Sequence, residues 1–328
     1  MKARARVGLL SFALLAPLAA PPEVAAEEQP AASADELVAA SPAAGFHYPY
    51  LLRIPGRLEA GGERVLLVEP NNTGAATDDF ELHLAAARKL SQGAIGASVS
   101  RALGLPLLVP VFQRPGTEWQ IYTHQLDRDT MALRDGPMRR LDLQLVAMID
   151  DARKRLGARG IRTPQEVLLT GFSASGTFVN RFTTIHPKRV LAVAGGGLNG
   201  ILIVPRAELG GVALPWPLGL ANLAEVTGAV FDEAAWKRVP QRYYMGALDD
   251  NDAVQYDDGY APDEKAIVDR AIGAKMQPDR WERCQALYRE AGANVTFRTY
   301  ENVGHFTDDR INAEIVDFFR AVLAARKP

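Results

Sequence analysis

Short apolar segments rich in β-branched residues alternate with segments of helical periodicity from about residue 43 onward, and this alternation constrains the fold more than any other feature. The predicted strands are Tyr48–Ile54, Arg64–Glu69, Leu107–Phe112, Glu166–Thr170, Val190–Ala194, Arg242–Gly246 and Val295–Tyr300. Apolar stripes between them predict helices, most clearly over 141–156 and 311–322. This alternation is typical of a mostly parallel central sheet with helices on both faces. We therefore expect an α/β domain over residues 43–328.

The composition excludes several classes of protein. The 328 residues are 48% hydrophobic and 23% charged, as in ordinary globular domains. With 37 basic and 39 acidic side chains the net charge is −2, so a basic surface for nucleic acid is not expected. The single cysteine, Cys284, excludes an internal disulfide and a cysteine-built zinc site. We expect no metal site, and the sequence does not predict an oligomeric state.

Residues 1–26 have the pattern of a secretory signal peptide. Basic residues at the start precede an apolar run, and small residues at 24–26 precede a plausible cleavage point. The run is too short to span a bilayer comfortably, so a retained membrane anchor is the less favoured alternative. We expect export to the periplasm or the medium without stable membrane insertion, and a flexible leader over residues 27–42.

A serine follows one of the predicted strands at a tight turn. The segment Gly171-Phe-Ser173-Ala-Ser175-Gly176 connects the strand Glu166–Thr170 to an apolar helix. Small residues on both sides of Ser173 suit a strained strand–turn–helix connection that presents the hydroxyl above the sheet edge. Ser173 is the predicted nucleophile and Ser175 is the fallback. The alternative is an ordinary turn with a serine capping the helix.

A serine nucleophile needs a base. His305 lies between the last predicted strand and the last predicted helix, where a loop at the carboxyl edge of the sheet could reach the serine. We interpret His186 as a structural residue at a helix end and His83 as solvated on an amphipathic helix. His47 and His124 carry no sign of a partner.

The base needs a carboxylate to orient it. Three aspartates follow the predicted strand Arg242–Gly246, and Asp249 is the first choice. Asp252 is the alternative acid and Asp250 the third candidate. The chain order serine, aspartate, histidine is typical of one fold family and differs from that of chymotrypsin-like and subtilisin-like enzymes.

Acyl transfer also needs donors for the oxyanion. The backbone N–H of Ala174, directly after the nucleophile, is one candidate. The loop after the strand Arg64–Glu69 offers a second through the backbone of Asn72 or Thr73, with Gly74 permitting close approach. The alternative is a plain turn built from turn-forming residues.

With these motifs in this order, residues 43–328 resemble the α/β-hydrolase superfamily, and within it secreted serine esterases of the polyhydroxyalkanoate-depolymerase-like and feruloyl-esterase-like branches. The resemblance rests on three segments: Gly171–Gly176, Gly246–Asp252 and Gly304–His305. It implies Ser173 as nucleophile, His305 as base, Asp249 as orienting acid, an acyl-enzyme, and no cofactor. The sequence departs from the family in the oxyanion loop, where Pro70-Asn71-Asn72-Thr73 replaces the common His-Gly dipeptide.

A long insertion, about residues 197–239, separates two of the predicted strands and is expected to form a cap near the active site. Trp216 is the predicted pocket wall, and the alternative is that it fills the insertion's own core. The predicted function is hydrolysis of a small-molecule or polymeric carboxylic ester. A serine peptidase of the same fold and a non-catalytic binding protein are the alternatives, and a sealed Ser173 would favour the latter.

Overall fold

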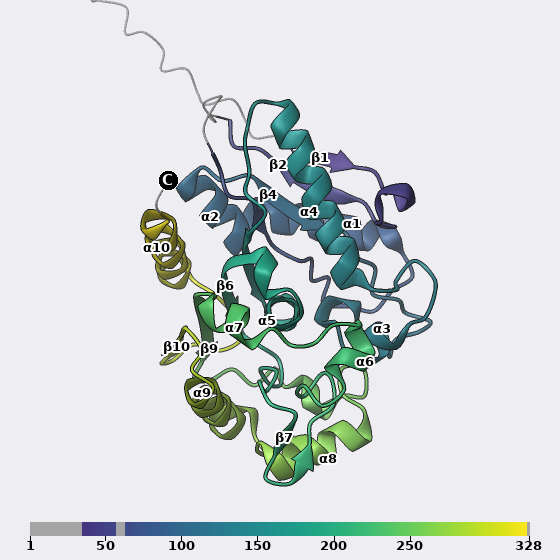
Figure 1. The fold of residues 1–328 in the computed structure, drawn as a ribbon, viewed down its shortest axis with the longest axis vertical. Coiled ribbons are helices and arrows are strands. Elements are labelled where there is room, and N and C mark those ends of the chain that lie inside the picture. Colours follow the sequence, from purple (N-terminus) through teal and green to yellow (C-terminus); the bar gives the residue numbers. More distant parts are fainter. Residues whose placement is uncertain (1–34, 57–62, 327–328) are drawn as a thin grey trace, which may run out of the picture. The chain divides into compact units, whose positions relative to one another are not determined.

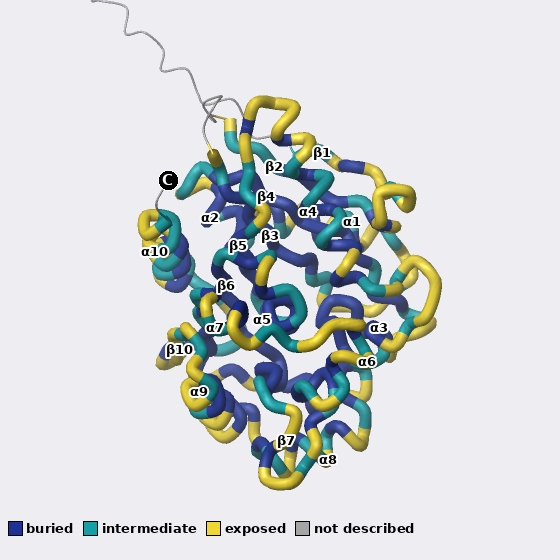
Figure 2. The backbone as a smooth tube through the Cα atoms, viewed as in Figure 1, coloured by how far each residue is buried: buried dark blue, intermediate teal, exposed yellow. Residues whose placement is uncertain are grey.

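A central sheet of eight strands organises the computed structural model, which describes residues 35–56 and 63–326. The strands are β1 (Asp35–Val38), β2 (Tyr50–Arg53), β3 (Leu67–Val68), β4 (Leu107–Pro110), β5 (Val167–Phe172), β6 (Val190–Gly196), β9 (Gln241–Gly246) and β10 (Val295–Tyr300). Their spatial order is β1-β2-β4-β3-β5-β6-β9-β10 (Figure 1; β3 and β5 are labelled in Figure 2). Strand β2 is antiparallel to both neighbours, and all pairs from β4 to β10 are parallel. The predicted, mostly parallel sheet is confirmed.

Helices cover both faces of this sheet. They are α1 (Phe80–Gly93), α2 (Ile95–Leu103), α3 (Arg128–Ala132), α4 (Leu141–Ala158), α5 (Ala174–Ile185), α6 (Leu223–Thr227), α7 (Glu233–Arg238), α8 (Pro262–Ala271), α9 (Trp281–Glu290) and α10 (Asp309–Ala325). Helices α1, α2 and α10 pack on one face, and α4, α5 and α9 contribute to the core on the other. None of the helices within the described ranges is long and apolar enough to cross a membrane.

Side chains of successive strand residues belong to two different hydrophobic cores, one on each face of the sheet. Leu51 and Leu67 belong to the core under α1, α2 and α10, whereas Leu52 and Val68 belong to the core under α4 and α5. This follows from the alternation of side chains along a strand. The central strands β3, β4 and β5 are therefore buried on both sides, and Figure 2 colours their backbone as buried, whereas the edge strands β1 and β10 are partly exposed. Burial on both sides explains why the sequences of these central strands are mostly apolar.

Strand β1 corrects the expected boundary of the leader. Residues 35–38 of the predicted flexible segment pair antiparallel with β2, in the register Asp35↔Arg53 to Val38↔Tyr50. The carboxylate of Asp35 lies 3.4 Å from the Arg53 guanidinium, and Val38 is buried. A four-residue edge strand is too short to show a period of two in sequence. The predicted signal peptide, residues 1–26, and leader residues 27–34 lie outside the described residues.

The insertion between β6 and β9 contains a small hairpin, β7 (Glu208–Leu209) and β8 (Val212–Ala213), followed by α6 and α7. Trp216 in this segment is fully buried, and its Nε1 donates a hydrogen bond to the Leu126 carbonyl at 3.0 Å. Because none of its surface is accessible, Trp216 is a core residue and the prediction of a pocket wall is wrong. Its indole ring packs the insertion onto the domain.

Candidate active site

Ser173 occupies the turn between β5 and α5 with φ 62° and ψ −129°, a conformation that non-glycine residues rarely adopt. Two glycines make this turn possible. A Cβ on Gly171 would lie 2.5 Å from the Ser175 carbonyl oxygen, and one on Gly176 would lie 2.5 Å from the Gly196 carbonyl oxygen. The turn therefore needs glycine at both positions, as the sequence motif indicated. Ser173 itself is partly exposed at the end of the strand.

Ser175, the fallback nucleophile, has a different place. It is 1% exposed, its Oγ donates to the Phe172 carbonyl at 2.8 Å, and it accepts a bond from the Phe172 N–H at 3.0 Å. Both bonds close the turn on itself. Ser175 thus stabilises the conformation that presents Ser173 and is not itself accessible.

His305 and Asp249 meet at the carboxyl edge of the sheet. Asp249 follows β9 and His305 follows β10, and these neighbouring strands are parallel, so both loops emerge at the same edge. Nδ1 of His305 lies 3.0 Å from Oδ1 and 2.9 Å from Oδ2 of Asp249. The Asp249 side chain is 1% exposed and that of His305 is 25% exposed. Because a carboxylate only accepts hydrogen bonds, Nδ1 carries the proton and donates the bond to Asp249. The lone pair of the neutral ring is then on Nε2.

The alternative acid, Asp252, is paired with Arg280 and not with His305. Its carboxylate forms an ion pair with the buried Arg280 guanidinium and accepts a hydrogen bond from the Val254 N–H at 3.1 Å. Asp250, the third candidate, is exposed. The structure brings only Asp249 of these three against His305, which corrects the alternative assignment.

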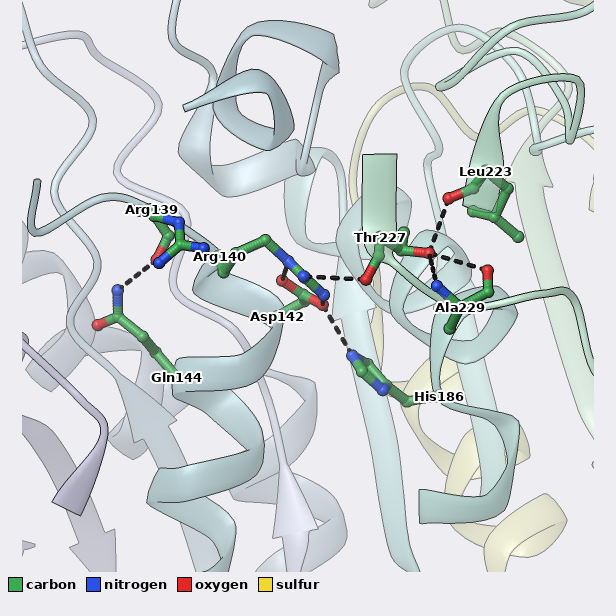
Figure 3. A network of polar contacts seen from close by, with 8 residues as sticks. All are labelled: Arg139, Arg140, Asp142, Gln144, His186, Leu223, Thr227 and Ala229. Atoms are coloured by element: carbon green, nitrogen blue, oxygen red, sulfur yellow. Dashed lines mark hydrogen bonds and ion pairs between the residues drawn. The ribbon is translucent and has the colours of Figure 1, made fainter. Parts of the chain in front are cut away.

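A second histidine–aspartate pair lies at the far end of α5. Nε2 of His186 is 2.9 Å from Oδ2 of Asp142, which also accepts a bond from Arg140 at 2.7 Å (Figure 3). Arg140 in turn donates to the Thr227 carbonyl at 3.0 Å. Ser173 precedes this 12-residue helix and His186 follows it, so about 18 Å of helix separates them. His186 is therefore a structural residue, as its sequence context suggested.

The predicted oxyanion loop follows β3, the direct neighbour of β5 in the sheet. Asn71 at its start is fully buried, donates to the Phe112 carbonyl at 2.8 Å and accepts from the Phe112 N–H at 3.0 Å. Asn72 Oδ1 accepts a bond from the Gly74 N–H at 3.1 Å and shapes the following turn. The loop is thus bonded to the end of β4 and leaves the sheet beside the Ser173 turn. Ala174 is the first residue of α5, so its N–H has no acceptor within the helix.

His83, predicted to be solvated, is fully buried, and that prediction is wrong. Its Nδ1 lies 2.6 Å from the Thr73 hydroxyl, and its Nε2 lies 3.0 Å from the Thr77 carbonyl. The amphipathic pattern of α1 predicts the helix correctly. It does not indicate that the loop after β3 covers His83 on the polar side of this helix. His124, also fully buried, contacts the Phe112 carbonyl at 2.9 Å, and burial lowers its pKa to about 3. Both imidazoles contact residues of the loop, His83 through the Thr73 hydroxyl and His124 through the Asn71 amide at 3.2 Å.

A buried carboxyl group precedes the same loop. Glu69 is 2% exposed, and its Oε2 accepts a bond from the Gly96 N–H at 2.8 Å. Burial raises the pKa of Glu69 to about 8, against the opposing effect of that hydrogen bond. Glu69 is therefore largely protonated at neutral pH. Across the described ranges, no cluster of three or more histidine, cysteine or acidic side chains could hold a metal ion.

Sequence reasoning missed Asn251. Its Nδ2 lies 3.0 Å from His305 Nε2 and 3.5 Å from Ser173 Oγ, so its amide reaches both groups. Its backbone N–H donates to Asp249 Oδ1 at 3.1 Å. In the sequence, an amide two positions after Asp249 carries no catalytic signal, because a histidine base is oriented by a carboxylate. Only the folded loop shows that Asn251 turns toward the other two residues.

Comparisons with known proteins agree with the architecture. No model of a protein family matches the sequence, and no curated protein matches it. Among solved structures, poly(aspartic acid) hydrolase-1 from Sphingomonas sp. KT-1 is similar over 89% of this chain and 97% of its own, with a TM-score of 0.54 and 16% identity. A truncated carbohydrate esterase from gut microbiota is similar over 91% and 99%, with a TM-score of 0.50 and 15% identity. With the mostly parallel sheet and the glycine-flanked turn after β5, these similarities show that the chain has the α/β-hydrolase fold.

Proposed function

We propose that the protein is a serine hydrolase that cleaves carboxylic esters through an acyl-enzyme on Ser173. The observation that carries the proposal is the pairing of His305 Nδ1 with the buried Asp249 carboxylate at 2.9 Å. This pair lies at the sheet edge at which the strained Ser173 turn also lies. A serine, a histidine with its Nε2 lone pair directed away from an aspartate, and free N–H groups at a helix start are the parts that acyl transfer requires.

In the proposed mechanism, Ser173 Oγ attacks the ester carbonyl while His305 Nε2 takes the hydroxyl proton. The Asp249 carboxylate keeps the ring in the tautomer with its proton on Nδ1 and stabilises the imidazolium that forms. The same proton then passes from Nε2 to the departing alcohol, which leaves an acyl group on Ser173. Water, deprotonated by His305, attacks this acyl group, and the acid departs as the serine regains its proton.

The oxyanion of each tetrahedral intermediate needs at least two donors. We assign one to the Ala174 N–H, at the positive end of α5. We assign the second to the backbone of Asn72 or Thr73, because their loop leaves the strand beside β5 and is held by Asn71. Backbone donors do not depend on residue type, so the departure from the family's His-Gly dipeptide is compatible with this role. The reaction uses groups of this chain and needs no cofactor.

The substrate class is proposed as a small or polymeric ester. The similarity to a carbohydrate esterase supports an ester. The similarity to poly(aspartic acid) hydrolase-1 makes amide hydrolysis, a peptidase-like activity, the second candidate. The partial exposure of Ser173 favours catalysis over a binding protein with a sealed site. The pattern of residues 1–26 supports export to the periplasm or the medium. The resemblance of the three motif segments supports an esterase of the depolymerase-like or feruloyl-esterase-like kind.

Labelling with a fluorophosphonate tests the proposal. We expect one phosphonyl adduct, mapped by peptide mass spectrometry to Ser173, that is absent in Ser173→Ala. In His305→Ala the labelling rate should fall by about 10²- to 10⁴-fold, because the general base is lost. His186→Ala is the matched control, since it disrupts the other histidine–aspartate pair and should leave the rate nearly unchanged. An adduct elsewhere, or equal labelling of wild type and Ser173→Ala, contradicts the proposal.

A panel of esters and matched amides then separates the two candidate activities. The ester proposal predicts turnover of acyl esters that is much faster than turnover of amides with the same acyl group. Faster turnover of the amides would identify a peptidase-like enzyme instead. Ser173→Ala is the blank for both series.

A further inference from the structure

We infer that the Asn251 side chain is a latch that keeps the nucleophile and the base apart in the free protein. This inference rests on the proposed function of Ser173 and His305. The amide group of Asn251 occupies the lone pair on His305 that must receive the Ser173 proton. Binding of an ester between the two residues displaces the amide and lets the serine donate to the histidine.

The geometry around the amide carries the inference. Asn251 Nδ2 is 3.0 Å from His305 Nε2, within the range of a hydrogen bond, and 3.5 Å from Ser173 Oγ, at the limit of that range. Its two N–H groups can point to these two atoms at once. The amide therefore contacts both the serine oxygen and the histidine nitrogen, the two atoms that the mechanism needs in direct contact.

The chemistry of the imidazole makes this contact exclusive. His305 donates from Nδ1 to Asp249, so its neutral ring offers a single lone pair, on Nε2. While Asn251 donates to that lone pair, the Ser173 hydroxyl cannot. Ser173 Oγ only accepts from the amide in this arrangement. The free protein thus holds a complete set of catalytic groups with the serine proton directed away from its acceptor.

The latch is anchored at its backbone and free at its side chain. The Asn251 N–H donates to Asp249 Oδ1 at 3.1 Å, which ties the loop to the same carboxylate that orients His305. The Asn251 residue itself is exposed, so its amide can rotate into solvent without disturbing the core. A hydrogen bond of this kind corresponds to about a 2- to 10-fold change in an equilibrium constant. The contacts that a bound substrate makes in the site are therefore sufficient to compensate for the loss of this hydrogen bond.

Substitutions at position 251 that remove the amide donors or replace them with a carboxylate test the latch. Asn251→Ala removes the competing donor, so the rate constant for phosphonylation of Ser173 by a small fluorophosphonate, kinact/KI, should rise by about 2- to 10-fold. This rise should result from a lower KI at an unchanged kinact, because the amide competes with the bound probe. Asn251→Asp places a carboxylate beside Nε2, which favours the protonated base, so labelling should slow by at least about 10-fold. Asn251→Ser, too short to reach Nε2, should behave as Asn251→Ala does.

Tyr256→Ala is the control in the same loop region, since this side chain is 63% exposed. Its rate should stay within twofold of the wild type. A role of Asn251 in loop structure alone would slow the alanine, serine and aspartate variants alike, and would lower their unfolding temperatures. Such a result, or an unchanged rate in Asn251→Ala, overturns the latch.

The same experiment separates this inference from the proposed function. If wild type and Ser173→Ala are labelled equally, the proposed function fails and the latch fails with it. If wild type is labelled on Ser173 and Asn251→Ala is no faster, only the latch fails.

Discussion

Nδ1 of His305 lies 2.9 Å from Oδ2 of Asp249, although 56 positions of sequence separate the two residues. Their strands, β10 and β9, pair in parallel from Val295↔Gln241 to Tyr300↔Gly246. The pairing brings the two following loops to one edge of the sheet, where the buried carboxylate accepts hydrogen bonds from His305 Nδ1 and from the Asn251 N–H. This relationship separates two aspartates that look alike in sequence.

Substitution by asparagine should affect activity at Asp249 and stability at Asp252. Asp249→Asn should lower kcat/KM for ester hydrolysis by about 10²- to 10⁴-fold, because the tautomer and the imidazolium lose their support. Asp252→Asn leaves the buried Arg280 without its ion-pair partner and should reduce the free energy of unfolding by about 3–5 kcal/mol. Activity assays and urea unfolding of both variants check this. Comparable loss of activity in Asp252→Asn under conditions where it is folded would contradict the assignment.

The turn at Ser173 should not tolerate a methyl group at its glycines. In Gly176→Ala the new Cβ would meet the Gly196 carbonyl oxygen at 2.5 Å, so we expect a loss of about 1–3 kcal/mol or more in the free energy of unfolding. Gly157→Ala is the matched control. Apart from its chain neighbours and the backbone of its own helix, no atom lies within 4 Å of its added Cβ, and its place in the last turn of α4 should make the alanine stabilising by about 0.5–1 kcal/mol. Chemical denaturation of the two variants should show shifts of opposite sign.

Glu69 should make stability depend on pH. Its folded pKa of about 8 lies above the reference value of 4.5, so the folded state holds more protons than the unfolded state between these values. Its contribution to stability is therefore present below about pH 4.5 and is lost as pH rises toward 8. Glu69→Gln keeps the neutral shape and removes this dependence.

The free energy of unfolding of wild type and Glu69→Gln, measured by urea at pH 5, 6.5 and 8, checks this expectation. The free energy of unfolding of Glu69→Gln should increase relative to that of the wild type as pH rises. His124, whose pKa burial lowers to about 3, acts in the opposite direction below pH 6.5, but its effect is common to both proteins and cancels in the difference. If the difference in free energy of unfolding between the two proteins does not change with pH, Glu69 is not buried in its protonated form.

Thr73→Val tests which atom of this residue supplies an oxyanion donor. The substitution removes the hydroxyl that contacts His83 Nδ1 at 2.6 Å and should lower the free energy of unfolding by about 1–3 kcal/mol. If the donor is a backbone N–H, kcat/KM for esters should fall by less than about 10-fold. A fall of about 10²- to 10³-fold would instead make the hydroxyl a direct donor.

Export can be checked by the mass of the mature protein. When the full chain is produced in a secreting bacterium, we expect a periplasmic or extracellular product that begins at Glu27, after removal of residues 1–26. Replacement of the three basic residues at the start with glutamate should retain the uncut chain inside the cell. An uncut chain in the membrane fraction would favour the retained anchor.

Local patterns in the sequence were sufficient for the strands of the main sheet from β2 onward and for the turn at Ser173. Apolar runs mark strands that are buried on both sides, and small residues around a serine mark a turn that excludes Cβ atoms at Gly171 and Gly176. Both signals come from a residue and its immediate neighbours, so the linear order of residues contains them. Strand β1 was missed because four residues at an edge carry too little of such a pattern.

The tertiary structure decided which side chains meet. The choice of Asp249 over Asp252, the burial of His83 under Thr73, and the position of Asn251 between Ser173 and His305 all depend on loops from different strands. Trp216 was assigned to a pocket wall for the same reason, since composition marks an aromatic residue but not the surface it faces. Strand pairing sets these contacts across distances that local sequence patterns do not encode. A residue's own neighbours predict its element, and only the packing of elements determines its partners.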